Sequence, residues 1–355
     1  MKKIIIDGYF LSENNPVGLH RFSSEILKKI DKYYNCSDIE IVVPSIKNID
    51  IELCNIKISE TACFLNKFGR LGMEIWKKIA FPFYVISNHG YAVDMAFAQQ
   101  TIKCNVCGVF DCITLKCPEN FIGIKAKVTR FFNSLRIKKS AKKADFVITL
   151  SEDAKADIIQ YIDIPADKIK IIGCAWQHIN DISYDDGIFD KLPNSYKKGN
   201  YFFSLGSQYY HKNMKWVLEA AKQNPNELFV VTGKKFGNLM NELNEPNIYY
   251  TGYLSDSEIK SLMKYSKAFI QPSFYEGFGI PPMEALALGR QIIISNTSSL
   301  PEIYGKSAHY IDPYNYKKIN LSEILNSPVE GASSILESYS WKKSAEQFLN
   351  ILREL

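Results

Sequence analysis

The chain has 355 residues, 46% of them hydrophobic and 23% charged, and a formal net charge of +5. This length favours two domains. The net charge is too small to indicate nucleic-acid binding. No run reaches the roughly 20 apolar residues of a membrane helix, and the N-terminal MKKIIIDGYF enters a strand pattern rather than a signal-peptide core. We therefore expect a cytoplasmic protein.

The eight cysteines lie mostly in apolar runs, and a chain of this size needs no disulfide, so we expect reduced thiols. Four of them are the candidates for a zinc site: Cys104, Cys107, Cys112 and Cys117. The first two lie in a strand-like run at a spacing that points them to opposite faces, which disfavours zinc.

From the N-terminus onward, strand-like runs alternate with helix-like runs, beginning with KKIIIDGYF, FSSEILKKIDKYY and IEIVVPS. This alternation is typical of parallel sheets with crossover helices. The first half ends with the strand ADFVITLS, a helix that Ser151 can cap, and the strand KIKIIGCAW. We predict that residues 1–180 form one doubly wound α/β domain.

Within this half, IKAKVTRFFNSLRIKKSAKKA indicates a basic amphipathic helix. The favoured interpretation is a surface helix whose apolar stripe faces the core and whose basic face is solvated. The alternative is docking to anionic lipid. The apolar stripe consists of Ile124, Val128, Phe131, Phe132, Leu135 and Ile137. The basic residues are Lys125, Lys127, Arg130, Arg136, Lys138, Lys139, Lys142 and Lys143.

After a polar, turn-rich stretch at 181–199, which we interpret as a linker, the alternation restarts. Strand-like and helix-like runs from YFFSLGS to HYIDP predict a second α/β domain over 200–339. We expect the C-terminal helix, 340–355, to pack back on the first domain.

The strongest motif is QPSFYEGFGIPPMEALALGRQIIISN, in which a strand leads to a glycine-rich loop and then a helix. Open α/β sheets bind ligands at the carboxyl ends of their strands, so this loop belongs at a binding site. Its glycines let backbone N–H groups approach an anion, and Glu276 and Glu284 can accept hydrogen bonds from hydroxyls on either side. A ligand with hydroxyls at both ends and negative charge between them is a nucleotide-sugar. The alternative is a helix-capping glutamate beside a tight turn.

A second motif, YFFSLGSQYYHKNMKWVLEA, again places a glycine between a strand and a helix, which begins near Asn213. Lys212 precedes this helix N-terminus, an unfavourable place for a cation unless an anion is bound there. We assign Lys212 to the donor diphosphate, and a solvated loop lysine is the alternative.

These two motifs resemble those of the family-4 retaining glycosyltransferases, which have the GT-B architecture. The family's Glu-x7-Glu signature corresponds to Glu276 and Glu284, and its glycine-to-Lys-Asn segment runs from Gly206 to Asn213. Further matches are PVGLHRFSSEIL, SLPEIYG with HYIDP, and YSWKKSAEQFLNILREL. The resemblance implies an α/β fold of two Rossmann-like, doubly wound domains facing each other across a cleft.

The resemblance also implies roles. Glu276 would contact hydroxyls of the donor sugar, Glu284 the ribose and Lys212 the diphosphate. To the same donor site we assign Gly18, Ser207, His211, Tyr253, Leu254, Gly277, Phe278, Gly279, Ile280 and Ser298. Such enzymes retain the anomeric configuration by a front-face, ion-pair-like substitution. Lys212 and helix dipoles would stabilise the leaving diphosphate, so we expect no metal and no cofactor.

Two positions depart from the family pattern in the donor half. Many members carry an arginine directly after the glycine or before the conserved lysine, whereas this sequence has Ser207 and His211. His211 could donate a hydrogen bond to phosphate, but a neutral imidazole stabilises a leaving group less than a guanidinium does.

The first half departs as well, because Phe110-Asp111 stands where many members carry His-Asp. His178 in CAWQHIND or His20 in VGLHRF could replace this acceptor-side histidine, and a structural role is the alternative for each. Besides Glu276 and Lys212, we therefore predict His178 and Asp111 as catalytic residues.

The sequence thus predicts a retaining glycosyltransferase that moves a hexose or deoxyhexose to a glycan or lipid-linked oligosaccharide, in O-antigen or capsule biosynthesis. We expect no nucleic-acid partner, and possible partners include an anionic membrane on the inner face of the plasma membrane. The alternatives are a nucleotide-sugar epimerase of the same fold and a non-catalytic nucleotide-sugar-binding subunit. A dehydrogenase is poorly supported, because the first strand leads into DGYFLSENNPVG rather than a Gly-x-Gly-x-x-Gly turn.

Overall fold

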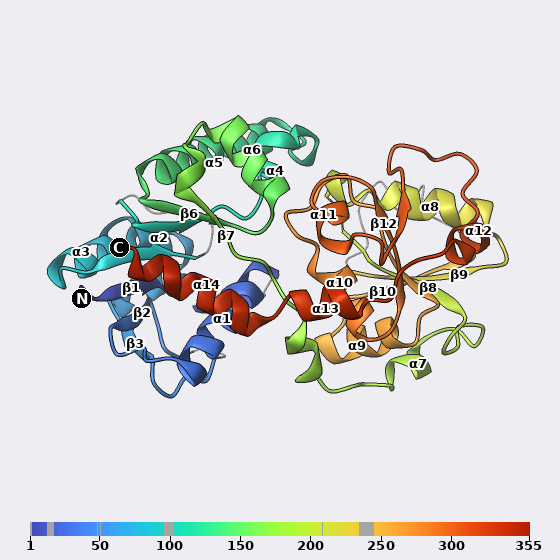
Figure 1. The fold of residues 1–355 in the computed structure, drawn as a ribbon, viewed down its shortest axis with the longest axis horizontal. Helices are drawn as coiled ribbons and strands as arrows, with labels where there is room; N and C mark the ends of the chain where they lie inside the picture. The colour runs from blue at the N-terminus through green and yellow to red at the C-terminus, as the bar shows by residue number, and fades with distance from the viewer. Residues whose placement is uncertain are drawn as a thin grey trace. The chain divides into compact units, whose positions relative to one another are not determined.

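The computed structural model describes residues 2–12, 18–47, 49, 51–95, 103–207, 209–233 and 245–355. The chain forms two compact units (Figure 1). The first comprises Met1–Cys174 with Trp341–Leu355, and the second comprises Ala175–Ser340.

The stretch expected as a linker, 181–199, lies inside the second unit. Its residues bind a helix of that unit, α9 (Asp256–Lys264). The Lys191 ammonium lies 2.6 Å from a carboxylate oxygen of Glu258, and the Lys260 ammonium donates to the Ile182 carbonyl at 2.6 Å. These contacts make the stretch part of a folded unit.

The first unit contains a seven-stranded parallel sheet in the order β3-β2-β1-β4-β5-β6-β7. Ile4 of β1 pairs with Ile39 on one side and with Tyr91 on the other, so the strand order reverses at β1. This reversal makes the sheet doubly wound, as predicted. The strands are β1 (Ile4–Asp7), β2 (Ile39–Val43), β3 (Lys57–Glu60), β4 (Tyr91–Asp94), β5 (Val106–Gly108), β6 (Phe146–Thr149) and β7 (Ile169–Ile171).

Helices cover both faces of this sheet. The α-helices are α1 (Gly18–Tyr33), α2 (Gly69–Ile75), α3 (Phe81–Ser87), α4 (Ile113–Lys116), α5 (Ile124–Lys143), α6 (Glu152–Ile162) and α14 (Trp341–Arg353). Shorter helical turns are η1 (Tyr9–Ser12), η2 (Cys63–Phe68), η3 (Trp76–Ala80), η4 (Pro118–Asn120) and η5 (Ala166–Lys168). The Ser151 hydroxyl accepts the Ala154 N–H at 3.1 Å, which confirms the predicted cap of α6.

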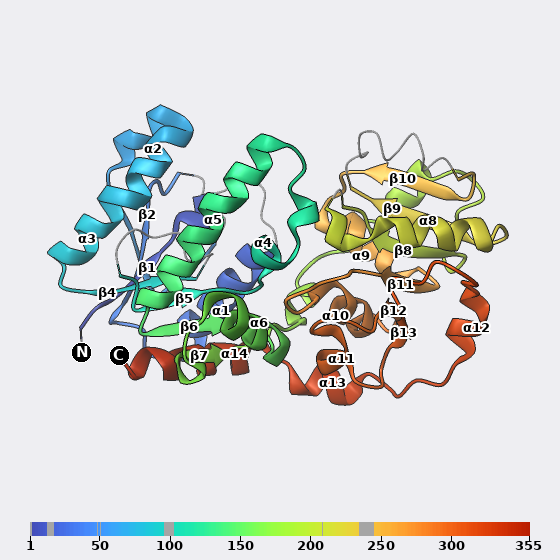
Figure 2. The same ribbon diagram turned by 90° about the horizontal axis from the view of Figure 1, so that it is seen from above.

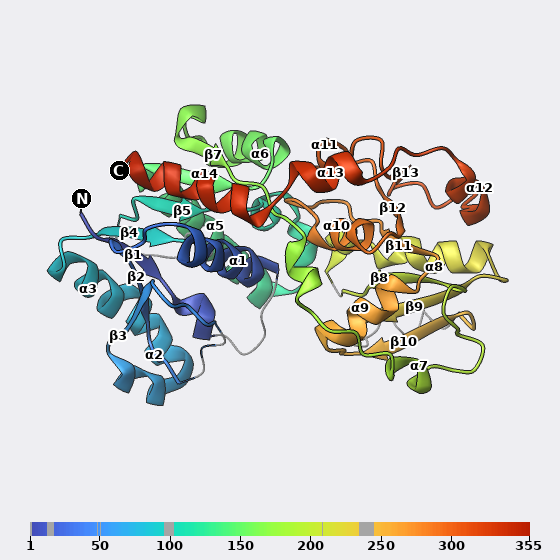
Figure 3. The same ribbon diagram turned by 60° about the horizontal axis from the view of Figure 1, so that its bottom comes forward.

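The C-terminal helix α14 packs beside α1 in the first unit (Figure 3). The Trp341 and Phe22 rings meet edge to face at 6.2 Å, and the Ser344 hydroxyl donates to the Gly173 carbonyl at 2.6 Å. On the other side of the sheet lie α2, α3 and α5 (Figure 2). They cover a core of strand and helix side chains that includes Ile5, Trp76 and Phe81.

The favoured interpretation of the basic helix is wrong. Five of the six residues of its expected core-facing stripe are exposed, from 49% at Val128 and Leu135 to 84% at Ile124. Only Ile137 packs partly against the core, and the fully buried positions of α5 are Ser140 and Ala141. Small residues near its C-terminus thus attach α5 to the unit, while its large apolar side chains face outward.

The second unit contains a six-stranded parallel sheet in the order β10-β9-β8-β11-β12-β13. Phe203 of β8 pairs with Val230 of β9 and with Phe269 of β11, so the order reverses at β8. The strands are β8 (Tyr201–Leu205), β9 (Leu228–Thr232), β10 (Ile248–Gly252), β11 (Ala268–Gln271), β12 (Gln291–Ser295) and β13 (His309–Ile311). A ligand site is expected where β8 and β11 end.

Apart from α9, the helices of this unit are α7 (Ile188–Lys191), α8 (Met214–Gln223), α10 (Ile280–Ala287), α11 (Leu300–Tyr304), α12 (Leu321–Asn326) and α13 (Ser333–Ser338). Two helical turns, η6 (Gln177–Asn180) and η7 (Tyr210–Lys212), carry candidate site residues.

None of the eight cysteines, all of which lie in described ranges, forms a disulfide. No group of three or more His, Cys, Asp or Glu side chains that could hold a metal ion occurs among the described residues. Within the same ranges, no helix is long and apolar enough to span a bilayer.

Candidate functional site

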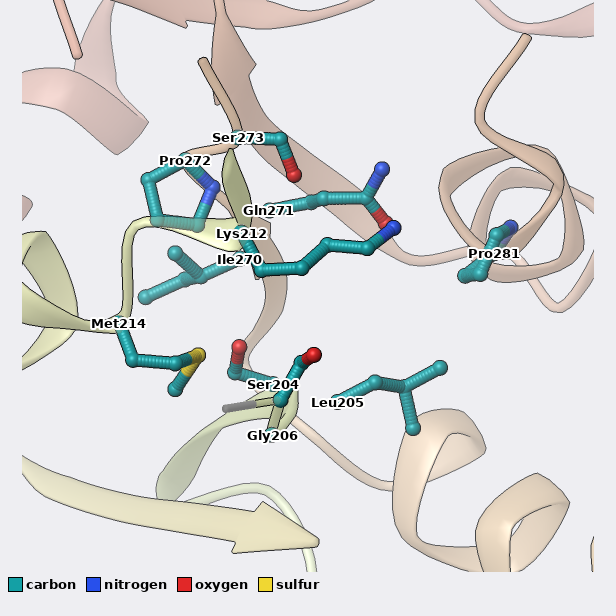
Figure 4. A pocket seen from close by; sticks show the side chains of 11 residues that line it. Ser204, Leu205, Gly206, Lys212, Met214, Ile270, Gln271, Pro272, Ser273 and Pro281 are labelled. Carbon is teal, nitrogen blue, oxygen red and sulfur yellow. The ribbon is translucent and has the colours of Figure 1, made fainter. Parts of the chain in front are cut away.

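The ends of β8 and β11 enclose a cavity of about 110 Å³ (Figure 4). After β8 the chain continues through Gly206 and Ser207, which line it, and after β11 through Pro272 and Ser273, which line it too. Lys212 at the end of η7 also contributes to its wall. The cavity therefore lies at the point where the strand order of the second sheet reverses.

Gly206 brings β8 and β9 into close contact at this edge. Its N–H donates to the Thr232 carbonyl at 2.7 Å, and a Cβ at this position would lie 2.1 Å from the same oxygen. Any side chain would force the two strand ends apart, which explains the glycine. The next residue, Ser207, uses its hydroxyl to accept the Tyr209 N–H at 3.2 Å.

Lys212 and Glu276, 64 positions apart in sequence, form an ion pair beside the cavity. The Lys212 ammonium lies 2.8 Å and 3.0 Å from the two Glu276 oxygens. Of the two side chains, that of Glu276 is buried and that of Lys212 is partly exposed. The ammonium thus reaches from the rim toward the carboxylate, and Figure 4 shows it converging with the side chain of Gln271.

Two further donors hold Glu276. The Ser273 hydroxyl donates to its Oε1 at 2.6 Å and the Gln271 amide to the same oxygen at 3.0 Å. Burial alone would raise the pKa of Glu276, but the charge of Lys212 and hydrogen bonds from Lys212 and Ser273 outweigh it and lower the pKa. Glu276 is therefore an oriented carboxylate at neutral pH.

The glycine-rich loop ends in a left-handed turn at Gly279, whose φ is +85°. A Cβ there would lie 2.7 Å from Leu300, so this position requires glycine in both backbone conformation and space. Ile280 then starts α10, with proline in its first turn as predicted. Phe278 is buried, with its ring 5.3 Å from that of Tyr339, and Gly277 lies between it and Glu276.

The second carboxylate, Glu284, is buried within α10 and pairs with a histidine. His178 on η6 places Nε2 2.6 Å from Glu284 Oε1, and both side chains are buried. His178 was predicted as an acceptor-side catalytic residue. The structure places it against the carboxylate expected to hold the ribose.

His211 differs from the arginine of many family members in charge as well as shape. Burial, with the neighbouring charge of Lys212, lowers the pKa of His211 to about 4, so its imidazole is neutral at pH 7. Its backbone carbonyl accepts the Phe274 N–H at 2.7 Å, which joins the Lys212 turn to the Glu276 loop.

The remaining donor-site candidates of this unit are Ser298, Tyr253 and Leu254. Ser298, at a φ of +51°, accepts the Glu276 N–H on its hydroxyl at 3.0 Å. Tyr253 is 81% exposed just after β10, and Leu254 beside it is half-buried. Neither of these two residues lines the cavity.

Three candidates belong to the first unit. Gly18 is the first residue of α1, and nothing lies within 4 Å of a Cβ placed there. His20, two positions on, is buried with its ring 6.3 Å from that of Phe10. Asp111 accepts the Ile113 N–H on Oδ1 at 2.9 Å, at the start of α4.

The residues that orient the pair were not predicted from the sequence. Gln271 and Ser273 were quoted in the motif without a role, although polar residues at a strand end beside a predicted site are themselves a signal. Asn213 was also missed. It adopts a φ of +50°, and its amide donates to the carbonyls of Pro272 and Pro313 at 3.0 Å and 2.9 Å. It thereby fixes the Lys212 turn to the loop after β11.

Comparison with known proteins finds a family match within the second unit. Residues 187–327 match the family model described as glycosyl transferases group 1. The match covers most of this unit. The resemblance predicted from the sequence is thereby confirmed, and the matched residues include Lys212, Glu276 and Glu284.

Curated relatives share about a quarter of the aligned residues with the chain. The serotype-specific mannosyltransferase WbdA of Escherichia coli is 27% identical over 256 residues, which are 66% of this chain and 31% of the relative. O-antigen chain mannosyltransferase B of Escherichia coli is 27% identical over 222 residues, 58% of this chain and 55% of the relative. The chain thus spans about a third to a half of the length of these relatives.

Solved structures match the entire chain. Sucrose-phosphate synthase from Thermosynechococcus elongatus has a TM-score of 0.73 at 14% identity, covering 100% of this chain and 99% of that one. Anabaena Alr3699/HepE, in complex with UDP and glucose, has a TM-score of 0.69 at 17% identity and covers 100% of both. The predicted GT-B fold class is confirmed.

Proposed function

We propose that this protein is a retaining glycosyltransferase that moves a hexose or deoxyhexose from a nucleotide-diphosphate sugar to a glycan or lipid-linked oligosaccharide. The observation that supports this most is the Lys212–Glu276 pair at the cavity where β8 and β11 end. It places a cation for the diphosphate beside an oriented carboxylate for the sugar hydroxyls. The family-model match of the second unit supports the same activity.

The chemistry requires a cation near the leaving group. As the bond from the anomeric carbon to the diphosphate breaks, negative charge grows on the phosphate oxygens, and the Lys212 ammonium stabilises it. The acceptor oxygen bonds to the same face of the anomeric carbon, and its proton passes to the departing diphosphate. We propose that this charge is balanced without a divalent metal, because Lys212 and the backbone N–H groups of the glycine-rich loop supply the positive field.

In this proposal, Glu276 binds the sugar part of the donor and Glu284 binds its ribose. Ser273 and Gln271 keep the Glu276 carboxylate facing Lys212, where it accepts hydrogen bonds from the sugar. Glu284, oriented by His178, accepts from the ribose. The cavity of about 110 Å³ is smaller than the roughly 300–1,000 Å³ of a complete small-molecule site, so we assign it to the diphosphate and sugar end of the donor.

The sugar and the acceptor are proposed from the relatives. The curated relatives are named mannosyltransferases, whereas the HepE structure holds UDP and glucose, which supports a hexose in either case. One relative is named for the O-antigen chain, which supports surface polysaccharide biosynthesis. A lipid-linked acceptor fits the same setting.

A thermal-shift panel of UDP-, GDP- and dTDP-sugars, each with and without EDTA, tests donor binding. A ligand at about 100 times its dissociation constant stabilises the folded state by roughly 2.7 kcal/mol, so one base should raise the Tm clearly. EDTA should leave this shift unchanged, and loss of the shift in EDTA would contradict the metal-independent proposal. The absence of a shift with every nucleotide-sugar would instead support the non-catalytic alternative.

A further inference from the structure

The helical segment 63–87 of the first unit is apolar on two opposite faces. Its inner face carries Leu65, Trp76, Phe81 and Val85, all buried in the core. Its outer face carries six large apolar side chains that are 61% to 71% exposed: Phe64, Phe68, Leu71, Ile79, Phe83 and Ile86. Most of these six are three or four residues apart, so they follow one side of the helical path. Packing within the unit accounts only for the inner face.

A second exposed apolar stripe lies on α5 and just before it. Its members are 49% to 87% exposed: Ile122, Ile124, Val128, Phe131, Phe132 and Leu135. The Phe131 and Phe132 rings meet edge to face at 5.6 Å, so they form one apolar projection. Isolated exposed apolar residues are normal on a protein surface. Contiguous stripes of this kind mark a contact with another protein or with a membrane.

The helices that carry the two stripes lie on the same side of the first sheet (Figure 2). An Arg136 guanidinium nitrogen of α5 is 3.8 Å from the Glu74 carboxylate of α2. Ile75 beside Glu74 and Ile137 beside Arg136 both pack against the same core cluster. We call the twelve exposed residues of the two stripes the outer apolar surface.

The charges around this surface are almost all positive. Helix α5 carries eight Lys and Arg residues and no Asp or Glu. In segment 63–87, Lys67 and Lys78 add to them, and the acidic Glu74 is bound by Lys78 at 2.9 Å as well as by Arg136. Protein–protein interfaces are depleted in lysine, whereas aromatic and aliphatic side chains flanked by lysines are typical of helices in a lipid interface.

We propose that the outer apolar surface docks this protein on an anionic membrane. The apolar side chains enter the boundary between headgroups and acyl chains, and the lysines of α5 lie against acidic headgroups. This proposal uses residues of the first unit alone. It does not depend on the proposed donor site, and either can fail without the other.

Cosedimentation of the full chain with phosphatidylcholine vesicles, with and without phosphatidylglycerol, tests the proposal. We expect binding to the anionic vesicles that weakens with added salt, since salt screens exposed charges beyond about 8 Å at 0.15 M. The pair Phe68→Ser and Phe83→Ser, and separately the pair Phe131→Ser and Leu135→Ser, should each weaken binding roughly tenfold or more, because each removes two apolar side chains that enter the membrane.

The charge reversals Lys125→Glu and Lys127→Glu should reduce binding to anionic vesicles and leave the low binding to neutral ones unchanged. The matched control is Ile159→Ser on α6, a 40% exposed apolar side chain outside both stripes, which should bind like the unmodified protein. Because all the substituted side chains are exposed, we expect unchanged melting temperatures. If one of the two stripe variants misfolds, the other still tests the proposal.

No binding of the unmodified protein to phosphatidylglycerol vesicles would overturn the proposal. So would stripe variants that bind as well as the Ile159→Ser control. A dimer in solution that the stripe substitutions dissociate would also overturn it and assign the surface to a second copy of the chain. Thermal shifts with nucleotide-sugars on the same variants report the donor site independently.

Discussion

Two buried carboxylates of the second unit, eight positions apart, are held in different ways. Glu276 in the loop after β11 contacts a lysine, a serine and a glutamine. Glu284 in α10 contacts the imidazole of His178. The charge of Lys212 and the hydrogen bonds from Lys212 and Ser273 lower the pKa of Glu276. The comparison indicates that several donors keep the loop carboxylate ionised, whereas a histidine orients the helix carboxylate.

The largest effect should follow from breaking the loop pair. Glu276→Gln or Lys212→Ala should lower kcat/KM for transfer by about 10² to 10³, because each removes a preorganised charge beside the proposed leaving group. Steady-state assays with the donor base found by thermal shift measure this. The control is Lys215→Ala, a lysine three positions on whose ammonium lies 4.9 Å from the centre of the Tyr316 ring. Full activity of either site variant would show that the site is wrongly assigned.

A smaller effect should follow from removing the partner of the helix carboxylate. His178→Ala leaves Glu284 without its imidazole contact, which we expect to cost about 1–3 kcal/mol of stability and to raise KM for the donor. His178→Gln can still donate a hydrogen bond and should recover most of both. Chemical denaturation and donor-dependent kinetics measure the two quantities.

The same variants separate two roles of His178. A positioning role predicts a changed KM for the donor with kcat nearly preserved. A fall in kcat with the donor KM unchanged would instead support the acceptor-side catalytic role predicted from the sequence.

The smallest effect concerns acid stability. Since the folded-state pKa of Glu276 lies below its ordinary value of 4.5, the ionised pair stabilises the fold at neutral pH. This stabilisation is complete above about pH 4.5 and is lost as the pH falls through the lowered folded-state pKa. The difference in unfolding free energy between the unmodified protein and Glu276→Gln should therefore narrow below pH 4.5. A constant difference from pH 7 to pH 3 would contradict the assignment.

Much of the architecture could be predicted from the sequence by itself. The alternation of strand and helix patterns indicated two parallel sheets, and the motif around Glu276 indicated a loop at a strand end followed by a proline-started helix. The Ser151 cap and the glycine-rich loop that includes Gly279 could also be predicted. These features depend on local backbone preferences and on periodicity, which neighbouring residues determine.

Only the tertiary structure decided which side chains meet. The contacts of Lys212 with Glu276 and of His178 with Glu284 join residues 64 and 106 positions apart, and they depend on strand order and helix placement. The direction of the α5 stripe was decided in the same way. Periodicity shows that one side of a helix is apolar, but the packing of Ser140 and Ala141 against the unit determines that this side faces outward.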